Sequence, residues 1–155
     1  IINRVFNKMK SKYQNDQKAN FGNEHSLFAV EAITTTITLA AEDSGKFYTV
    51  DAAGGAYVIT LPSPTAGIRY DFVVVEDTPT GAVTITATGA LIYGRVLEGE
   101  VDTDDDAVGS SGATGQTSFV ITAAANRGDS FRLVCDGTYW YAQGVSALDG
   151  SFTVA

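Results

Sequence analysis

The residues of this chain that could do chemistry are few, and the most prominent group is a set of carboxylates in the polar stretch 99–116, "GEVDTDDDAVGSSGATGQ". They are four closely spaced aspartates: Asp102, Asp104, Asp105 and Asp106. Alternate carboxylates can converge on one calcium ion, but an EF-hand loop would require glycine at Ala107 and a bidentate glutamate at Ala113. We therefore predict a long exposed acidic loop without a bound metal.

Nucleophiles and general bases are present only singly. His25 is the one histidine, beside Glu24 and Ser26, and a general base needs a positioned partner within hydrogen-bond reach. The serines in turns and loops lack the strand, sharp turn and helix of a hydrolase nucleophile. Two carboxylates from distant strands would also support hydrolysis, but nothing in the sequence selects a pair. We expect a protein that is not an enzyme and holds no cofactor.

The aromatic cluster at residues 139–141 is the remaining candidate site. In a strand, alternation places Tyr139 and Tyr141 on one face and Trp140 on the other. We interpret Trp140 as a core residue and the two tyrosines as candidate contacts with a neighbouring subunit. A platform that stacks against sugar rings is the alternative, because aromatic rings serve both purposes.

The elements that position these residues are predicted to be strands. A chain of 155 residues with 45% hydrophobic residues and 16 glycines is typical of one mainly β domain, which we place at residues 27–155. We predict an antiparallel β-sandwich or small β-barrel, opened by a long strand or strand pair in "LFAVEAITTTITLAA". The other predicted strands are Lys46–Asp51, Tyr57–Leu61, Arg69–Glu76, Val83–Ala87, Leu91–Leu97, Ser118–Ala123, Ser130–Cys135, Thr138–Gly144 and Ser151–Val154.

Local signals support this division into strands. Asp136-Gly137 separates "SFRLVC" from "TYWYAQG" and suits a two-residue type I′ hairpin, in which both central residues take positive φ. Pro62 and Pro64 end one strand, because proline cannot donate to the ladder. Cys135 is the only cysteine, so no intrachain disulfide forms and we expect it buried as a small hydrophobe.

The segment 1–26 differs from the rest of the chain and is predicted to be a basic arm and hinge. Its first 20 residues carry five basic side chains and one acidic one, a local charge of +4 against a total of −8. Apolar side chains recur at helical spacing and form one stripe of a short helix that needs a surface to lie against, on its own body, a second copy or another protein. The candidate docking residues are Ile2, Arg4, Phe6, Lys8, Met9, Lys10, Lys12 and Tyr13.

The acidic body argues against a nucleic-acid surface, which requires clustered lysine and arginine. No apolar run is long enough for a membrane span, and the N-terminus lacks the apolar core of a signal peptide. We therefore expect partners that are neither nucleic acid nor membrane.

The order of three segments resembles β-domains of tailed-phage virion proteins, both capsid decoration (cement) proteins and tail-fibre or spike proteins. The segments are "AAEDSGKFYTVDAAGGAYVITLPSPTAGIRYDFVVVED", "VTITATGALIYG" and "GDSFRLVCDGTYWYAQG", and the resemblance covers approximately residues 40–145. It implies a β-sandwich or barrel that assembles, usually as a homotrimer, without catalytic residues.

Two functions are consistent with that resemblance. The first is a decoration protein, made in the host cytoplasm, that binds the major capsid protein on the capsid exterior, with the arm gripping the shell. The second is a receptor- or carbohydrate-binding module of a tail fibre or spike. We favour the first, because the arm is set apart by its charge and the chain shows no shaft-like repeat.

Overall fold

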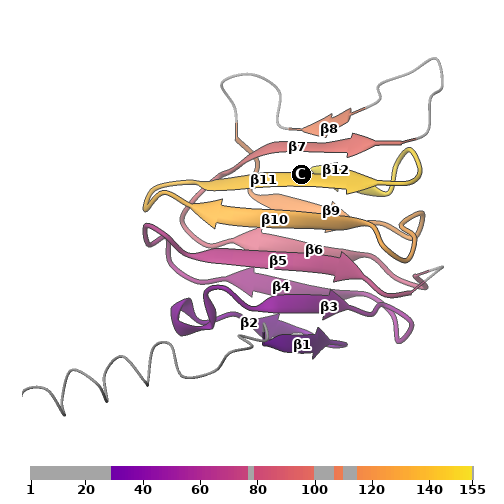
Figure 1. Cartoon of the computed structure of the whole chain (residues 1–155), viewed down its shortest axis with the longest axis horizontal. Coiled ribbons are helices and arrows are strands. Elements are labelled where there is room, and N and C mark those ends of the chain that lie inside the picture. The colour runs from indigo at the N-terminus through magenta and orange to yellow at the C-terminus, as the bar shows by residue number, and fades with distance from the viewer. Residues whose placement is uncertain (1–28, 77–78, 100–106, 110–114, 155) are drawn as a thin grey trace, which may run out of the picture.

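The computed structural model describes residues 29–76, 79–99, 107–109 and 115–154, with only the backbone at 107–109. Two β-sheets pack face to face and enclose the core between them (Figure 1). The predicted arm at 1–26 with all its docking residues, His25 and the four aspartates of the acidic loop lie outside the described residues.

The larger sheet, sheet A, has seven strands and the smaller, sheet B, has five. A short 3-10 helix, η1 (Ala41–Asp43), precedes β3. In spatial order sheet A contains β1 (Val30–Ile33), β3 (Phe47–Val50), β5 (Arg69–Val74), β10 (Ser130–Cys135), β11 (Trp140–Ser146), β7 (Ile92–Glu98) and β8 (Ala107–Gly109). Sheet B contains β12 (Phe152–Val154), β9 (Ser118–Ile121), β6 (Val83–Ala87), β4 (Tyr57–Leu61) and β2 (Ile37–Thr38).

The first half of the domain winds between the two sheets. Strands β1, β3 and β5 are parallel neighbours in sheet A, while β2, β4 and β6 are parallel neighbours in sheet B. Each connection carries the chain to the opposite sheet. When the chain returns to the first sheet, the new strand runs in the same direction as its neighbour there. The second half is different: the antiparallel hairpin β10–β11 lies between β5 and β7, and β9 and β12 extend sheet B antiparallel.

The mainly β class and most strand positions are confirmed, but the expectation of purely antiparallel pairing is wrong. Five of the ten described strand pairs are parallel, and the sheets are two separate open sheets rather than one closed barrel. An alternating pattern indicates which side chains face the core. It does not indicate which strands are neighbours or whether they run parallel.

The predicted acidic loop also contains an unpredicted element. Strand β8 lies within residues 99–116 and pairs antiparallel with β7, so this part is sheet edge rather than loop. The stretch 27–41, predicted as a long strand or a strand pair, contains two short strands, β1 in sheet A and β2 in sheet B.

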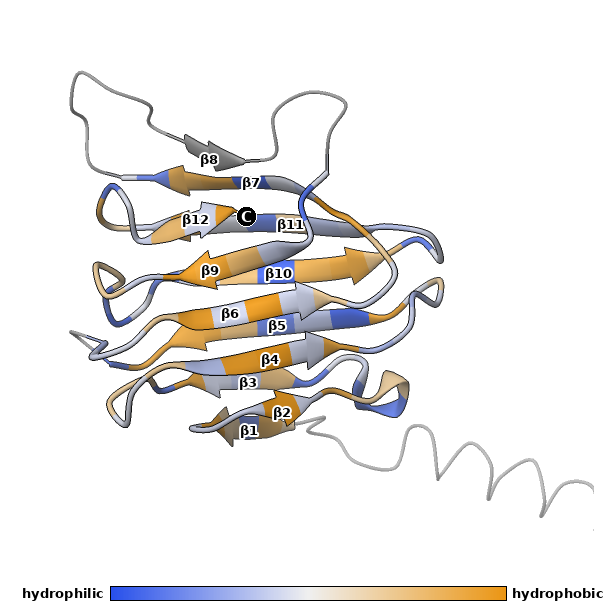
Figure 2. Cartoon of the chain, turned by 180° about the vertical axis from the view of Figure 1, so that it is seen from behind, coloured by the Kyte–Doolittle hydropathy of each residue, from blue (hydrophilic) through white to orange (hydrophobic). Residues whose placement is uncertain are grey.

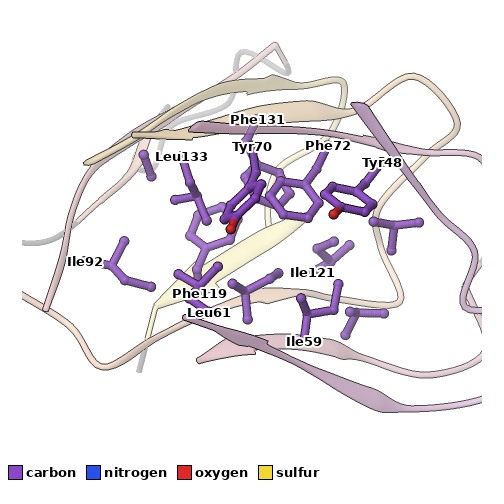
Figure 3. Close-up of a cluster of buried hydrophobic side chains, with 14 of the residues drawn as sticks. Tyr48, Ile59, Leu61, Tyr70, Phe72, Ile92, Phe119, Ile121, Phe131 and Leu133 are labelled. Atoms are coloured by element: carbon purple, nitrogen blue, oxygen red, sulfur yellow. The ribbon is translucent and has the colours of Figure 1, made fainter. Parts of the chain in front are cut away.

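The core consists of aromatic rings from sheet A packed against aliphatic and aromatic side chains from sheet B (Figure 3). Tyr70 stacks on Trp140 with ring centroids 5.9 Å apart, and Phe72 stacks on Phe131 at 4.8 Å. Trp140 and Cys135 are both buried, as predicted. The hydroxyl of Tyr70 donates to the carbonyl oxygen of Ala40 at 2.6 Å, which satisfies a polar group that packing would otherwise isolate.

Within the described part of the chain, no helix has the length and apolar character needed to cross a membrane.

Candidate functional site: the outer face of sheet A

The face of sheet A that points away from the core carries most of the distinctive side chains of the domain. The strand register aligns one residue from each of five neighbouring strands in a single row across this outer face. In order, the row is Phe47, Asp71, Arg132, Gln143 and Arg95. The face therefore combines aromatic, charged and amide groups within a few strand spacings of about 4.8 Å each.

Arginines concentrate on this face. Asp71 forms ion pairs with two of them: its Oδ2 lies 3.2 Å from Arg69 Nε, and its Oδ1 accepts a hydrogen bond from Arg132 Nε at 2.5 Å. Arg95 is exposed and makes no ion pair with any residue that the structure describes. The strand residues of the outer face thus include three of the five basic residues of segment 27–155, against a single aspartate.

Exposed aliphatic side chains lie beside the arginine row. Leu97 and Val145 are register partners in β7 and β11, with exposed fractions of 59% and 55%. Leu148, just beyond β11, is 40% exposed. Large apolar side chains gathered on one surface of a soluble domain commonly mark a binding surface.

A shallow depression of about 480 Å³ lies on the same face, along the row from Phe47 to Gln143 and beside Val145. Gly144 is one of its lining residues, and β10 passes so close to it that a Cβ there would lie 2.6 Å from Phe131 Cβ. Phe47, Arg132 and Val145 are also among the lining residues.

Three tyrosines form a cluster at one end of the face. Tyr93 of β7 contacts Tyr139 with perpendicular rings and centroids 5.2 Å apart, and it stacks on Tyr141 at 6.3 Å. Tyr139 and Tyr141 are 37% and 42% exposed. The two predicted candidates therefore do lie together, and Tyr93 is the member that sequence reasoning missed.

The hairpin between β10 and β11 holds this cluster, in a form that differs from the prediction. The strands end at Cys135 and Trp140, so the connection has more than two residues, and only Gly137 takes positive φ, at 102°. A type I′ turn is therefore wrong here. Asp136 keeps negative φ because its Oδ1 accepts from the backbone N–H groups of Thr138 at 2.7 Å and Tyr139 at 2.8 Å.

The same carboxylate ties the turn to the tyrosine cluster. The Tyr141 hydroxyl donates to Asp136 Oδ2 at 2.9 Å. The backbone N–H of Tyr139, then that of Thr138, lower the pKa of Asp136 below its ordinary value, and the hydrogen bond to Asp136 raises the pKa of Tyr141. At neutral pH the pair is a carboxylate accepting from a neutral phenol, which fixes the ring of Tyr141.

The arrangement is suited to binding. Among the described residues there is no group of three or more histidine, cysteine, aspartate or glutamate side chains that could hold a metal ion.

Sequence reasoning missed Arg69, Arg95 and Arg132 as members of the site. Each is one outward residue in a different strand, and only the register, with β7 beside β11, brings them onto one face.

No protein-family model matches this chain, and no curated protein is similar enough to it to indicate a relationship.

Proposed function

We propose that this protein is a non-enzymatic structural protein of a virion, a capsid decoration (cement) protein that assembles as a homotrimer on the outside of the shell. The observation that carries the proposal is the outer face of sheet A, which gathers exposed tyrosines, arginines and aliphatic side chains on one sheet surface.

The composition of this face supports protein–protein contact. Buried parts of interfaces are enriched in tyrosine and arginine and depleted in lysine and glutamate. The outer face has Tyr93, Tyr141 and Arg95 together with exposed Leu97 and Val145. Burial of Leu97 and Val145 would contribute at about 25 cal/mol per Å² of apolar area, before the costs of ordering.

The charge distribution favours a cyclic arrangement over a two-fold dimer. Outside the first 20 residues the chain is strongly acidic, yet the outer face of sheet A concentrates arginines. A two-fold contact through this face would set arginines against arginines. A ring uses two different surfaces, so the arginine face of one subunit would meet an acidic surface of the next.

Within this proposal Tyr139 and Tyr141 pack at the subunit boundary, and the basic arm contacts the shell. The stripe Ile2, Phe6, Met9 and Tyr13 supplies apolar contact, and the basic side chains orient the arm against acidic groups. Three arms on one trimer bind together, so modest individual contacts give stable attachment through effective concentration.

The direct test mixes the purified chain with undecorated phage shells and separates bound from free protein by sedimentation. We expect saturable binding of trimers, which deletion of residues 1–20 abolishes while the β-domain stays folded and trimeric. Phe6→Ala should weaken shell binding more than Lys10→Ala, because an exposed ion pair contributes only about 0–1 kcal/mol. Decoration by the truncated protein at full affinity would refute the role of the arm, and a strict monomer at micromolar concentration would refute the trimer.

A further inference from the structure

Two exposed side chains of opposite charge, Arg95 of β7 and Glu42 of η1, lack a partner within the described part of the chain. Neither side chain makes an ion pair or a hydrogen bond with any residue that the structure describes. Opposite charges left unpaired on one molecule can pair across two copies of it. Their positions in the fold decide whether this is the only way in which they can meet.

Arg95 and Glu42 lie toward opposite edges of sheet A. Glu42 belongs to η1, which leads into β3, whereas Arg95 is on β7, and β5, β10 and β11 lie between β3 and β7 (Figure 1). The four strand spacings from β3 to β7, each about 4.8 Å, amount to roughly 19 Å. The two side chains cannot span that distance, so an ion pair between them can form only between two molecules.

Each of these two edges also carries an exposed aliphatic side chain. Leu97 follows Arg95 on the outward side of β7 and is 59% exposed. Val30 of β1, at the other edge of the sheet, is 64% exposed. These are the two highest exposed fractions among the large apolar side chains of the described residues. Each edge therefore combines an unpaired charge with apolar area, and both contribute to protein–protein interfaces.

Lys46 holds the edge formed by η1 and β1 in a fixed shape. Its Nζ lies 2.7 Å from Glu31 Oε2 in β1 and 2.6 Å from Asp43 Oδ1 in η1. Asp43 Oδ2 also accepts a hydrogen bond from the backbone N–H of Ala40 at 3.3 Å. Lys46 is thus shared between two carboxylates, and Glu42 adds a negative charge that Lys46 does not pair with. A surface that is ordered before contact loses little conformational entropy on binding.

We infer that Arg95 of one subunit forms an ion pair with Glu42 of the next subunit, and that Leu97 packs against Val30 in the same contact. The inference rests on the proposed trimer and names the acidic surface that the arginine face meets. Because the two surfaces lie at opposite edges of sheet A, each subunit contacts one neighbour through β7 and the other neighbour through η1 and β1. Such a head-to-tail contact closes into a ring.

Charge reversal tests this contact on the full chain, with sedimentation equilibrium as the measurement. Arg95→Glu and Glu42→Arg should each raise the concentration at which half of the chains are monomeric by about tenfold or more, because like charges then face each other. The double variant exchanges the two charges and should return that concentration to within about threefold of the parent value.

Control variants separate the contact from a general effect of charge. Thr153→Arg and Thr153→Glu place charges of either sign on the outer face of sheet B and should change the same concentration by less than about twofold. Leu97→Ala and Val30→Ala test the apolar part. If the two side chains touch, the loss in the double variant is smaller than the product of the two separate losses.

Two outcomes would overturn the inference, and they differ in what they say of the proposed function. If the parent is a trimer and the single reversals leave it intact, or the double variant is no better than the singles, the contact is wrong while the trimer stands. If the parent is a strict monomer at micromolar concentration, the trimer and this contact are both refuted.

Discussion

The outer faces of the two sheets belong to one sandwich and follow the same alternation, yet they carry different chemistry. On sheet B one row across four strands consists of short hydroxyl side chains: Thr38, Thr60, Thr86 and Ser118. Sheet A presents arginines, tyrosines and exposed aliphatic groups instead. Figure 2 views sheet B from outside, and Figure 1 views sheet A.

This difference is the reason why we propose sheet A, and not sheet B, as the face that contacts a partner. Threonine fits a pleated surface well and keeps its hydroxyl hydrated, so a threonine row stabilises a strand without attracting a partner. Leu97 and Val145 leave apolar area in water, and Arg95 leaves a charge without a partner among the described residues. A partner that covered Leu97 and Val145 would remove their apolar area from water, which is favourable. A partner that covered the threonine row would instead remove the water that hydrates the hydroxyl groups.

The largest effect is expected where β7 joins sheet A and so completes the outer face of that sheet. Gly94 has φ of 134°, and a Cβ there would collide with the backbone carbonyl of Ala142. Gly94→Ala should lower the free energy of unfolding by about 2–4 kcal/mol. Gly89→Ala is the matched control, because φ is also positive there but nothing lies within 4 Å, and it should cost only about 1 kcal/mol. Equal values in urea unfolding would contradict the close approach of β7 and β11.

The second effect separates the two faces directly. Val145 in sheet A and Val58 in sheet B are exposed valines in strands, 55% and 38% accessible. Val145→Asp should weaken trimer formation at least tenfold, since it would bury a carboxylate in an apolar contact, whereas Val58→Asp should change it less than twofold. Sedimentation equilibrium measures both. If Val58→Asp were the more damaging change, sheet B would be the assembly face.

A third variant should make the outer face of sheet B prone to self-association. Replacing Thr38, Thr60 and Thr86 together with valine keeps the shape and the strand preference, so the free energy of unfolding should change by less than about 1 kcal/mol. The new apolar stripe should cause association beyond the proposed trimer, visible as light scattering that rises with concentration more steeply than for the parent. An unchanged scattering profile would show that face chemistry is not what distinguishes the sheets.

The smallest effect concerns pH at the tyrosine end of sheet A. The pKa of Asp136 is lowered in the folded protein, mainly by the N–H groups of Tyr139 and Thr138. The stabilisation is therefore fully present above the unfolded value of about 3.9 and is lost as pH falls through the lower folded pKa. The amide signals of Thr138 and Tyr139 should titrate only below that value, and Asp136→Asn should remove the transition. A midpoint at or above the ordinary carboxyl range would contradict the hydrogen bonds.

The bounds of several strands could be predicted from the local alternation of apolar and polar residues. Tyr57–Leu61, Val83–Ala87 and Ser130–Cys135 have the predicted bounds, because each is an alternating run closed by turn residues. The burial of Trp140 opposite exposed Tyr139 and Tyr141 follows from the same two-residue period. The hairpin turn was misjudged because the Asp136 carboxylate, bonded to the following amides, offered an alternative to a positive φ.

By itself, then, the sequence determined the mainly β class, the inward and outward side of most residues and the exposure of the two tyrosines, since these depend on the two-residue period of a strand. Only the tertiary structure decided that β1, β3 and β5 stack in parallel, that β7 lies beside β11, and that Arg69, Arg95, Arg132 and Tyr93 share one surface. Strand partners are chosen by long-range packing and by connections that cross between sheets, and local hydrophobic pattern does not encode that choice.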